Sequence, residues 1–402
     1  MASLTRLAQQ AYTGLAKLPR PAQRLAVRTG HAVLQADLRL METPRVLTFF
    51  VTNRCDLRCS HCFLAAHLND PDSYTTEMSL DEIGQWVRTL RRRLATVLLT
   101  GGEPFLRRDL AEICLVFDRE NSTRQMTIPT NGSQPLRIEQ QLQRILQSTR
   151  LDLSVQVSLD GLRATHDARR GLDGSFDLAV ETARRLRKIA DSTSRLRCFV
   201  TTVVSKDNLN EVVALRKFVI SDLQIGHNAQ VERGTHTSVH NLPEEIASDF
   251  DPLPGTPGAP DLGELADVDQ QLDVAFGPTP DFHQRLDILK RRHLQHVART
   301  GTRPFKCQAG RLDAVVLPEG EVAICEMTQP FSNLRDHGLD FAKLWGSPEA
   351  ERARALTQRC ACTHSCNISN SMKYDKVTLE ALAGLGGSER ALPAVAAPAN
   401  QE

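Results

Sequence analysis

Hydrophobic and polar residues follow a regular rhythm along most of the chain, in which short apolar runs alternate with amphipathic segments. The apolar runs lie at 46–51, 96–100, 125–130, 152–159, 196–204 and 223–231. Their length indicates strands, whereas the segments between them have helical periodicity. This alternation predicts an α/β fold with a parallel sheet and crossover helices.

The segments between the runs place apolar residues on one helical face. Ser79 and Glu82 form a capping box, which predicts the start of a helix. Further helices are predicted around 110–117, 138–146, 176–189 and 209–220. The same pattern places Cys114 on the buried face of a helix and Cys198 within a strand, so we interpret both as structural thiols.

The two ends of the chain depart from this rhythm. Residues 1–44 are helical in pattern and mildly basic, with a break at Pro19 and Pro21. We expect a helix packed on the main domain; a surface helix that contacts a membrane or a partner is the alternative. After Gly234 the pattern weakens. Residues 251–260 are rich in proline and glycine and indicate a loop, a helix follows at 281–299, and the tail beyond Gly384 has a disordered composition.

Composition narrows the class of protein. The 402 residues are 41% hydrophobic and 24% charged with a net charge of +1, which predicts a globular chain of two or three domains without a nucleic-acid partner. The chain shows no run of 18 apolar residues and no secretory signal. Ten cysteines at tight spacings favour metal ligation in a reducing cytoplasm over disulfides.

Three cysteines follow the first predicted strand at the spacing C-x3-C-x2-C. They are Cys55, Cys59 and Cys62. Active residues of parallel α/β folds gather at the C-terminal ends of strands, where this loop lies. Thiolates suit iron–sulfur clusters or zinc, and a closed zinc site takes four ligands. Three ligands on a [4Fe–4S] cube leave one iron free. The alternatives are unrelated thiols or a zinc knuckle with a distant fourth ligand.

Turn sequences follow the next three predicted strands. The first turn, at 101–104, is Gly101, Gly102, Glu103 and Pro104; its glycines permit close backbone approach, and its carboxylate can accept a hydrogen bond from an ammonium group. Thr130 and Asn131 end the third strand, and Ser158 ends the fourth. Because Asn-Gly and Asp-Gly are common turn formers, these last residues also fit a purely structural role.

This order of motifs resembles the radical S-adenosylmethionine (radical SAM) superfamily. The resemblance implies that the free iron chelates the methionine end of SAM, and that residues 101–104 hold its amino group. It also implies that Thr130, Asn131 and Ser158 contact its ribose and carboxylate. Position 61 is often aromatic in the family and is His61 here; the resemblance implies that its ring packs against the adenine of SAM. His166, Asp167 and Gly171 match a following segment that shapes the loop, and Arg169 is a candidate for binding an anion.

A second cysteine set lies near the C-terminus. It comprises Cys307, Cys325, Cys360, Cys362 and Cys366. Apolar runs at 314–317 and 321–324 flank Pro318-Glu319-Gly320, which predicts a hairpin that brings Cys307 and Cys325 together. The set resembles the auxiliary-cluster domains called SPASM and twitch, which implies one auxiliary [4Fe–4S] cluster. Zinc is the alternative metal, and His364 is interpreted as a bystander.

Five thiols are one more than a cube needs. Cys360 and Cys362 are separated by a single residue, a tight chelate, so we expect only one of them to bind the cluster. The resulting hypothesis is that Cys307, Cys325 and Cys366 are obligatory ligands, with either Cys360 or Cys362 as the fourth.

The resemblance implies a partial (β/α)6 TIM-like barrel with a small C-terminal auxiliary domain. The predicted divisions are an N-terminal helical extension at 1–44, the barrel at 45–235, a variable segment at 236–300, the auxiliary domain at 301–375 and a disordered tail at 376–402. No catalytic side chain is assigned beyond the cluster ligands.

The implied activity is reductive cleavage of SAM to methionine and a 5′-deoxyadenosyl radical that abstracts a hydrogen atom from a substrate, with an electron donor of the flavodoxin or ferredoxin type. The auxiliary cluster is expected to accept an electron or to bind substrate. Residues 1–44 show no strand alternation typical of a peptide-binding wing, which favours a small metabolite such as a sugar, nucleoside or lipid-linked group. A peptide-modifying enzyme is the alternative. A non-catalytic iron–sulfur or zinc scaffold would not need Glu103.

Overall fold

A computed structural model gives the fold of the chain. It describes residues 18–232, 239–240, 244–247, 258–260, 262–274, 282–358 and 360–385. The predictions for residues 1–17, for the loop at 251–257 and for the tail from 386 onward lie outside the described residues.

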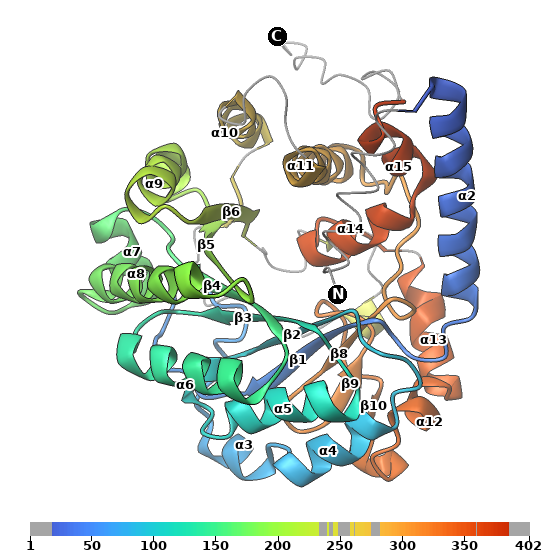
Figure 1. Cartoon of the computed structure of the whole chain (residues 1–402), viewed down its shortest axis with the longest axis horizontal. Helices are drawn as coiled ribbons and strands as arrows, with labels where there is room; N and C mark the ends of the chain where they lie inside the picture. Colours follow the sequence, from blue (N-terminus) through green and yellow to red (C-terminus); the bar gives the residue numbers. More distant parts are fainter. Residues whose placement is uncertain are drawn as a thin grey trace.

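The centre of the molecule is one sheet of nine strands among the described residues, in the order β10-β9-β8-β1-β2-β3-β4-β5-β6 (Figure 1). Six of these strands pair in parallel and in chain order: β1 Val46–Thr52, β2 Thr96–Gly101, β3 Gln125–Thr130, β4 Asp152–Ser158, β5 Leu196–Val204 and β6 Gly226–Val231. The six predicted strands are therefore confirmed, although the last begins at Gly226 because Leu223 ends the preceding helical turn.

Helices follow the parallel strands and cover one face of the sheet (Figure 1). They are α3 Pro71–Thr76, α4 Leu80–Arg88, α5 Leu110–Glu120, α6 Pro135–Ser148, α7 Arg163–Arg170, α8 Ser175–Ser192 and α9 Val212–Phe218. The predicted capping box is present: the Glu82 amide donates to Ser79 Oγ at 3.3 Å, and the Ser79 amide donates to Glu82 Oε2 at 2.8 Å. The predicted α/β partial barrel is confirmed; α7 is a helix that the periodicity did not indicate.

An aromatic cluster joins sheet, helix and C-terminal segment in one core. The Trp86 ring lies 5.6 Å from Phe49 of β1, 5.8 Å from Phe117 of α5 and 6.0 Å from Phe341, between ring centroids. All four rings are fully buried. Phe341 begins α12 (Phe341–Trp345), so the C-terminal part of the chain contributes directly to the core of the barrel.

The C-terminal hairpin extends the main sheet. Its strands β8 Asp313–Val316 and β9 Glu321–Ala323 pair antiparallel, as predicted, and β8 also pairs in parallel with β1. Strand β10 (Ser332–Asn333) completes this edge. The segments predicted as barrel and auxiliary domain thus share one sheet. The remaining C-terminal α-helices and strands are α13 Pro348–Thr357, β11 Ala361–Cys362, α14 Ser365–Ser371 and α15 Lys376–Leu382. The predicted disordered tail at 376–402 is therefore wrong at its start, because the Asp375 side chain caps α15 and this helix packs against α2.

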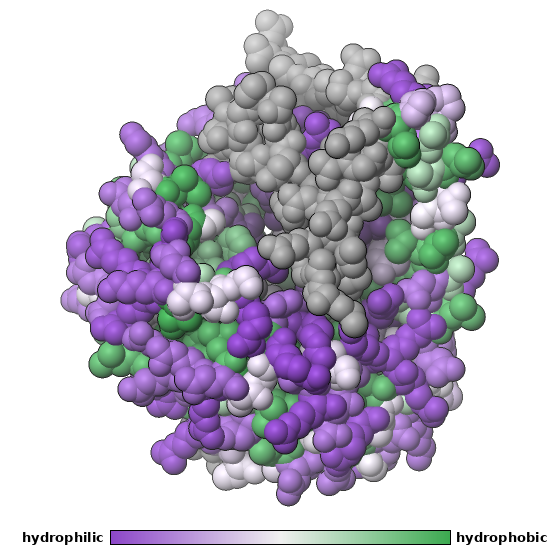
Figure 2. Space-filling model, in the orientation of Figure 1, coloured by the Kyte–Doolittle hydropathy of each residue, from purple (hydrophilic) through white to green (hydrophobic). Residues whose placement is uncertain are grey.

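The N-terminal helix α2 (Arg20–Arg39) packs against the C-terminal helices (Figure 1). Its Gln35 side chain donates to Tyr374 O at 2.9 Å. Its Asp37 also pairs with Arg92 of the barrel at 2.7 Å, so the predicted packing of a helix on the main domain is confirmed for α2. Leu25 and Val33 of this helix and its C-cap residue Leu40 are exposed. Hydrophobic and polar side chains are interspersed on the surface in the region of α2 (Figure 2). In the described part of the chain, no helix has the length and apolarity needed to cross a membrane.

The variable segment is partly described. It contains β7 (Val239–His240), α10 (Leu262–Val274) and α11 (Phe282–Thr300). The predicted helix at 281–299 corresponds to α11, whereas α10 was not expected. Strand β7 pairs with β11, which ties this segment to the strand that carries Cys362.

Candidate functional site

The first cysteine loop leaves the sheet at the C-terminal end of β1. Backbone bonds hold it against the turn after β2: the Gly102 amide donates to Thr52 O and the Glu103 amide donates to Arg54 O, both at 2.8 Å. Gly101 has a φ of +125°, and a Cβ on Gly102 would lie 2.2 Å from Arg54 O. The glycines therefore permit close approach by the backbone of the cysteine loop itself.

A buried ion pair lies beside the three thiols. Arg170 Nη1 is 3.5 Å from Cys59 Sγ, and Arg170 Nη2 is 2.6 Å from Asp160 Oδ2. His61 Nε2 approaches the same Asp160 oxygen at 3.1 Å. Burial alone raises the pKa of Asp160, but Arg170 and His61 outweigh it and hold that pKa well below its usual range. Sequence reasoning missed Arg170, and it placed Asp160 in a turn at 158–161 that either contacts SAM or is purely structural.

The segment around α7 anchors the cysteine loop from the other side. The Ser60 amide donates to Arg169 O at 2.9 Å, and Gly171 adopts a φ of +67° where a Cβ would lie 2.8 Å from Arg58 O. Arg169, the predicted anion-binding candidate, is instead bonded to Asp207 and Ser205.

The predicted loop-shaping role of His166 and Asp167 is confirmed. The Asp160 amide donates to His166 Nδ1, and Asp167 accepts from the Phe176 amide and from Ser175 Oγ.

Glu103 is a buried carboxylate surrounded by hydrogen-bond donors. It accepts from the Asn131 amide at 2.7 Å, from Thr130 Oγ1 at 2.9 Å and from the Phe105 amide at 3.1 Å. It forms no ion pair with any described residue. Burial raises the pKa of Glu103 to about 7, despite these donors. An acceptor of this kind fits an incoming ammonium group.

Asn131 connects the end of β3 to the cysteine loop. Its Nδ2 donates to Asp56 Oδ1 at 2.8 Å and lies 4.0 Å from Cys55 Sγ. Ser133 Oγ and Gln134 Nε2 donate to Asp56 as well. The structure therefore brings Thr130, Asn131, residues 101–104 and His61 together with the three cysteines. Ser158 ends β4 at the same edge of the sheet, half-buried and paired with Thr201.

The surroundings of the three thiols fit a cluster that takes thiolate ligands. Burial raises the pKa of Cys55 to about 12 and that of Cys62 to about 11 in the metal-free protein, so metal binding must displace protons. Arg170 supplies a positive charge beside Cys59. Phe50, Leu64 and Leu317 form an apolar cluster against Cys62. His61 Nδ1 is buried without a hydrogen-bond partner among the described residues.

Three of the C-terminal cysteines, Cys307, Cys360 and Cys362, lie near Arg303. Its Nη2 donates to Cys362 Sγ at 2.9 Å, and its charge also acts on Cys307 and Cys360. The Cys360 and Cys362 thiols are close enough to perturb each other: their interaction raises the pKa of Cys360 and lowers that of Cys362. Asn367 Nδ2 donates to Cys325 Sγ at 2.8 Å. The choice between Cys360 and Cys362 as a ligand stays a prediction, because the geometry does not separate them.

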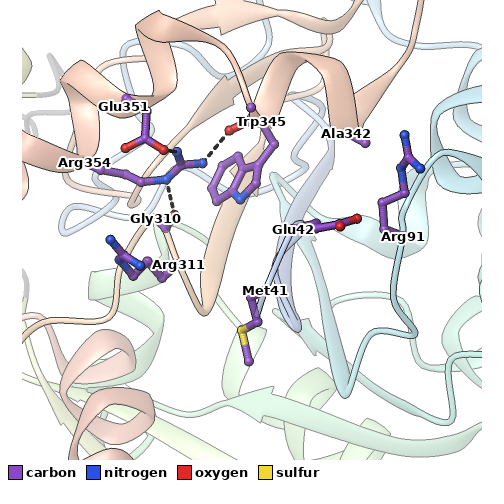
Figure 3. A pocket seen from close by; sticks show the side chains of 10 residues that line it. Met41, Glu42, Arg91, Gly310, Arg311, Ala342, Trp345, Glu351 and Arg354 are labelled. Atoms are coloured by element: carbon purple, nitrogen blue, oxygen red, sulfur yellow. Dashed lines mark hydrogen bonds and ion pairs between the residues drawn. The ribbon is translucent and has the colours of Figure 1, made fainter. Parts of the chain in front are cut away.

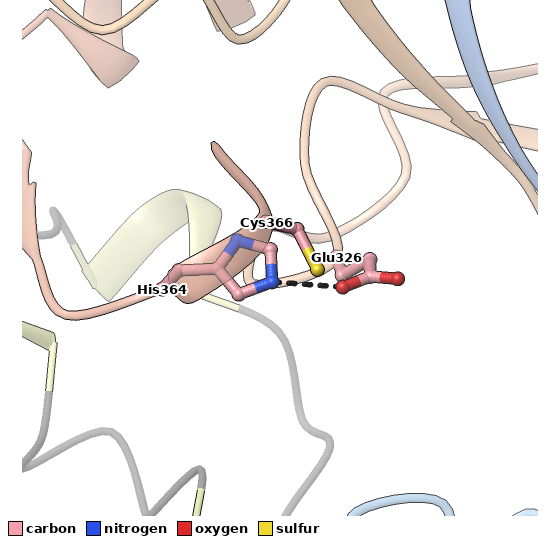
Figure 4. Close-up of side chains that lie close together, drawn as sticks. All are labelled: Glu326, His364 and Cys366. Atoms are coloured by element: carbon pink, nitrogen blue, oxygen red, sulfur yellow. Dashed lines mark hydrogen bonds and ion pairs between the residues drawn. The ribbon is translucent and has the colours of Figure 1, made fainter. Parts of the chain in front are cut away.

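His364 has buried polar neighbours and is therefore not isolated from the thiols. Its Nε2 lies 2.8 Å from Glu326 Oε2, and its Nδ1 lies 3.6 Å from Cys325 Sγ. Cys366 belongs to the same group of side chains (Figure 4). Sequence reasoning did not single out Glu326; its position directly after Cys325, at the end of the hairpin, was the available signal.

Two clefts are formed by described residues. One, of about 500 Å³, adjoins the cysteine loop at Asn53; its lining includes Phe50, Leu64, Asp70 and Glu319. The other, of about 430 Å³, contains Arg354 and Trp345 (Figure 3). Arg354 there donates to Gly310 O, Trp345 O and Glu351 Oε1, and lies 4.7 Å over the Trp345 ring. Those bonds use its donors within the fold, so we interpret the second cleft as structural.

Comparison with known proteins agrees with this geometry. Residues 49–219 match the family model described as the radical SAM superfamily. A relative named Fe-coproporphyrin III synthase, from Methanosarcina barkeri, is 30% identical over 42% of this chain and 39% of its own length. Pre-heme d1 synthase of Dinoroseobacter shibae is 30% identical over 48% of this chain and 47% of its own length. The chain thus spans less than half of these two relatives.

Other matches extend into the C-terminal part. Mycofactocin maturase MftC of Mycobacterium tuberculosis is 26% identical over 86% of this chain and 82% of its own length. SuiB of Streptococcus suis, solved bound to the precursor peptide SuiA, covers 87% of this chain and 77% of its own, with a TM-score of 0.55 and 15% identity. This structural likeness shows the shared fold.

Proposed function

We propose that this chain, a member of the radical SAM superfamily, is an enzyme that uses SAM to modify a peptide. Proteins of this superfamily bind a [4Fe–4S] cluster and SAM, and the SPASM-type relatives carry auxiliary clusters. When bound, these groups supply one-electron chemistry that removes a hydrogen atom from a substrate. The chain's own residues then have the task of holding, orienting and shielding them.

Cys55, Cys59 and Cys62 would hold the first cluster, and Glu103 would hold the amino group of SAM. Arg170 places a buried positive charge next to Cys59, where the thiolate ligands of a bound cluster would carry negative charge. Gly102 keeps the cysteine loop and Glu103 in contact, because the Glu103 amide and Arg54 O are bonded directly. The apolar cluster of Phe50, Leu64 and Leu317 excludes water on the Cys62 side.

The choice of a peptide as the substrate rests on how much of the chain aligns with peptide-modifying relatives. The relative aligned over 86% of the chain is named a maturase, and another relative is named a maturation protein for a sporulation killing factor. The related fold of SuiB has been solved with a precursor peptide. A cleft of about 500 Å³ beside Asn53, with Asp70, Glu319 and Glu321 in its lining, suits a basic or polar peptide segment. This proposal replaces the preference for a small metabolite that the N-terminal residues suggested.

A small metabolite is the second candidate, for a specific reason. Two relatives with 30% identity are named for iron-coproporphyrin and pre-haem synthesis. Both align over less than half of this chain, so they support the barrel and its SAM site more than they support a shared substrate.

The test is substrate-dependent SAM cleavage by the reconstituted full chain. Short peptides encoded near the gene and an iron-coproporphyrin are each added with SAM and a reductant under anaerobic conditions. We expect one peptide to increase 5′-deoxyadenosine formation and to change in mass. Acceleration by the tetrapyrrole alone, with every peptide unchanged in mass, would contradict the proposal. The Cys59→Ala chain controls for cluster-independent products.

A further inference from the structure

Three side chains of different chemistry converge beside the C-terminal thiols. They are Glu326, His364 and Cys366, whose oxygen, nitrogen and sulfur ligand atoms all lie within 4.8 Å of one another (Figure 4). Glu326 and His364 are buried, with 5% and 2% of their side chains exposed, and Cys366 is half-buried. From this convergence we infer that the three residues bind one divalent metal ion of the zinc type, separate from the auxiliary cluster.

The ligand chemistry supports a single ion. Zinc takes imidazole, thiolate and carboxylate ligands at about 2.0–2.3 Å in a tetrahedral arrangement. Two such ligands, one nitrogen and one oxygen, would then lie about 3.3 Å apart. The His364 Nε2 to Glu326 Oε2 distance is 2.8 Å, so a small outward shift of one side chain admits the ion. With three protein ligands, the fourth position remains for water or for a substrate donor.

The backbone fixes the ligands from two directions. Glu326 follows Cys325 at the end of the hairpin that extends the main sheet, whereas His364 and Cys366 flank the first residue of α14. The second ring nitrogen of His364 lies 3.6 Å from Cys325 Sγ. A metal-bound histidine commonly has such an outer partner, which orients its ring. Because Cys325 belongs to the cluster set, the ion would lie directly next to the cluster ligands.

The same assignment accounts for the surplus thiol. One cube takes four thiolates, and Cys307, Cys325, Cys360 and Cys362 supply four. Arg303 bonds to Cys362 and acts on Cys307 and Cys360. Cys366 instead completes the group with Glu326 and His364. This assignment replaces the hypothesis that Cys366 is an obligatory cluster ligand, and it gives both Cys360 and Cys362 to the cube.

The experiment counts metals in the full chain after anaerobic reconstitution with iron and sulfide. Excess metal is removed with a chelator, and Zn²⁺ or Co²⁺ is then titrated. The variants Cys366→Ser and Glu326→Gln keep the side-chain size. His337→Gln is the matched control, because His337 lies in the same part of the chain and bonds to Ser332.

We expect one Zn²⁺ per wild-type and control chain. In Cys366→Ser and Glu326→Gln, we expect binding weaker by more than about 100-fold, with iron content unchanged. The Co²⁺ complex should show a thiolate charge-transfer band that Cys366→Ser lacks. Loss of the auxiliary iron in Cys366→Ser would overturn the inference, as would equal zinc affinity in all four proteins. SAM cleavage by the wild type is measured separately, so a failure of the proposed function is distinguishable from a failure of this site.

Discussion

The two cysteine sites are held by different kinds of structure. The first three thiols lie on a single loop, which neighbouring turns fix through backbone bonds at Thr52, Arg54 and Arg169. The C-terminal thiols come from separate segments that a hairpin, β11 and α14 bring together. A charged side chain accompanies each set, but Arg170 has a buried carboxylate partner in Asp160. Arg303, in contrast, has thiols as its neighbours among the described residues. A local motif can therefore define one site, whereas the other depends on the completed fold.

Replacing Arg170 should lower the free energy of unfolding more than replacing Arg303. Arg170→Met leaves the Asp160 carboxylate buried without its main counter-charge, which should cost about 3–5 kcal/mol in the free energy of unfolding. Arg303→Met leaves thiols that can remain protonated in the metal-free protein, so its cost should be smaller. Denaturant unfolding of both metal-free variants measures the difference. Equal destabilisation would show that the Asp160 pair does not distinguish the sites.

A methyl group at Gly102 should disrupt only the first site. The new Cβ would lie 2.2 Å from Arg54 O, so the cysteine loop must move, at a cost of about 1–3 kcal/mol. We expect Gly102→Ala to lose iron from the first cluster and to retain the auxiliary iron. Gly84→Ala is the matched control, because its Cβ would meet only a side-chain atom at 3.7 Å. Iron analysis of both variants is the measurement; normal iron content in Gly102→Ala would contradict the packing argument.

A smaller effect concerns pH at the SAM site. The pKa of Glu103 is raised to about 7 by burial, so the carboxylate is mostly protonated below that pH and ionised above it. Since an ammonium group binds the ionised form, SAM affinity should fall by about tenfold in total as pH decreases from about 8 to 6. Calorimetric titration of wild type and Glu103→Gln tests this: the variant should bind weakly with a flatter pH dependence. An identical pH dependence in both proteins would assign it to another group.

The order of strands and helices followed from the sequence because hydrophobic periodicity is a local property. Gly101, Gly102 and Glu103 were identified in the same way, since a short motif contains the residues that touch. Arg170 was missed because its partner Asp160 is ten positions away and the adjacent Arg169 looked equivalent. The burial that distinguishes them depends on how α7 packs against the cysteine loop. Glu326 was missed for a similar reason, because only the folded hairpin and α14 bring it to His364.

The sequence also did not predict that the C-terminal hairpin joins the sheet of the barrel. The hairpin was predicted from its turn, but the parallel pairing of β8 with β1 joins residues more than two hundred positions apart. Local patterns do not encode such a pairing. It aligns the hairpin between Cys307 and Cys325 with the strand that leads into the first cysteine loop, which two independent domains would not require.

The most direct test of the account is a comparison of iron content and SAM cleavage in the wild type and Cys59→Ala. The account predicts about eight irons in the reconstituted wild type, given two cubes with thiolate ligands, and slow 5′-deoxyadenosine formation after reduction. Cys59→Ala should retain about four irons and form no 5′-deoxyadenosine. Equal SAM cleavage by both proteins, or loss of all iron from the variant, would contradict the separation of a SAM-cleaving site from an auxiliary one.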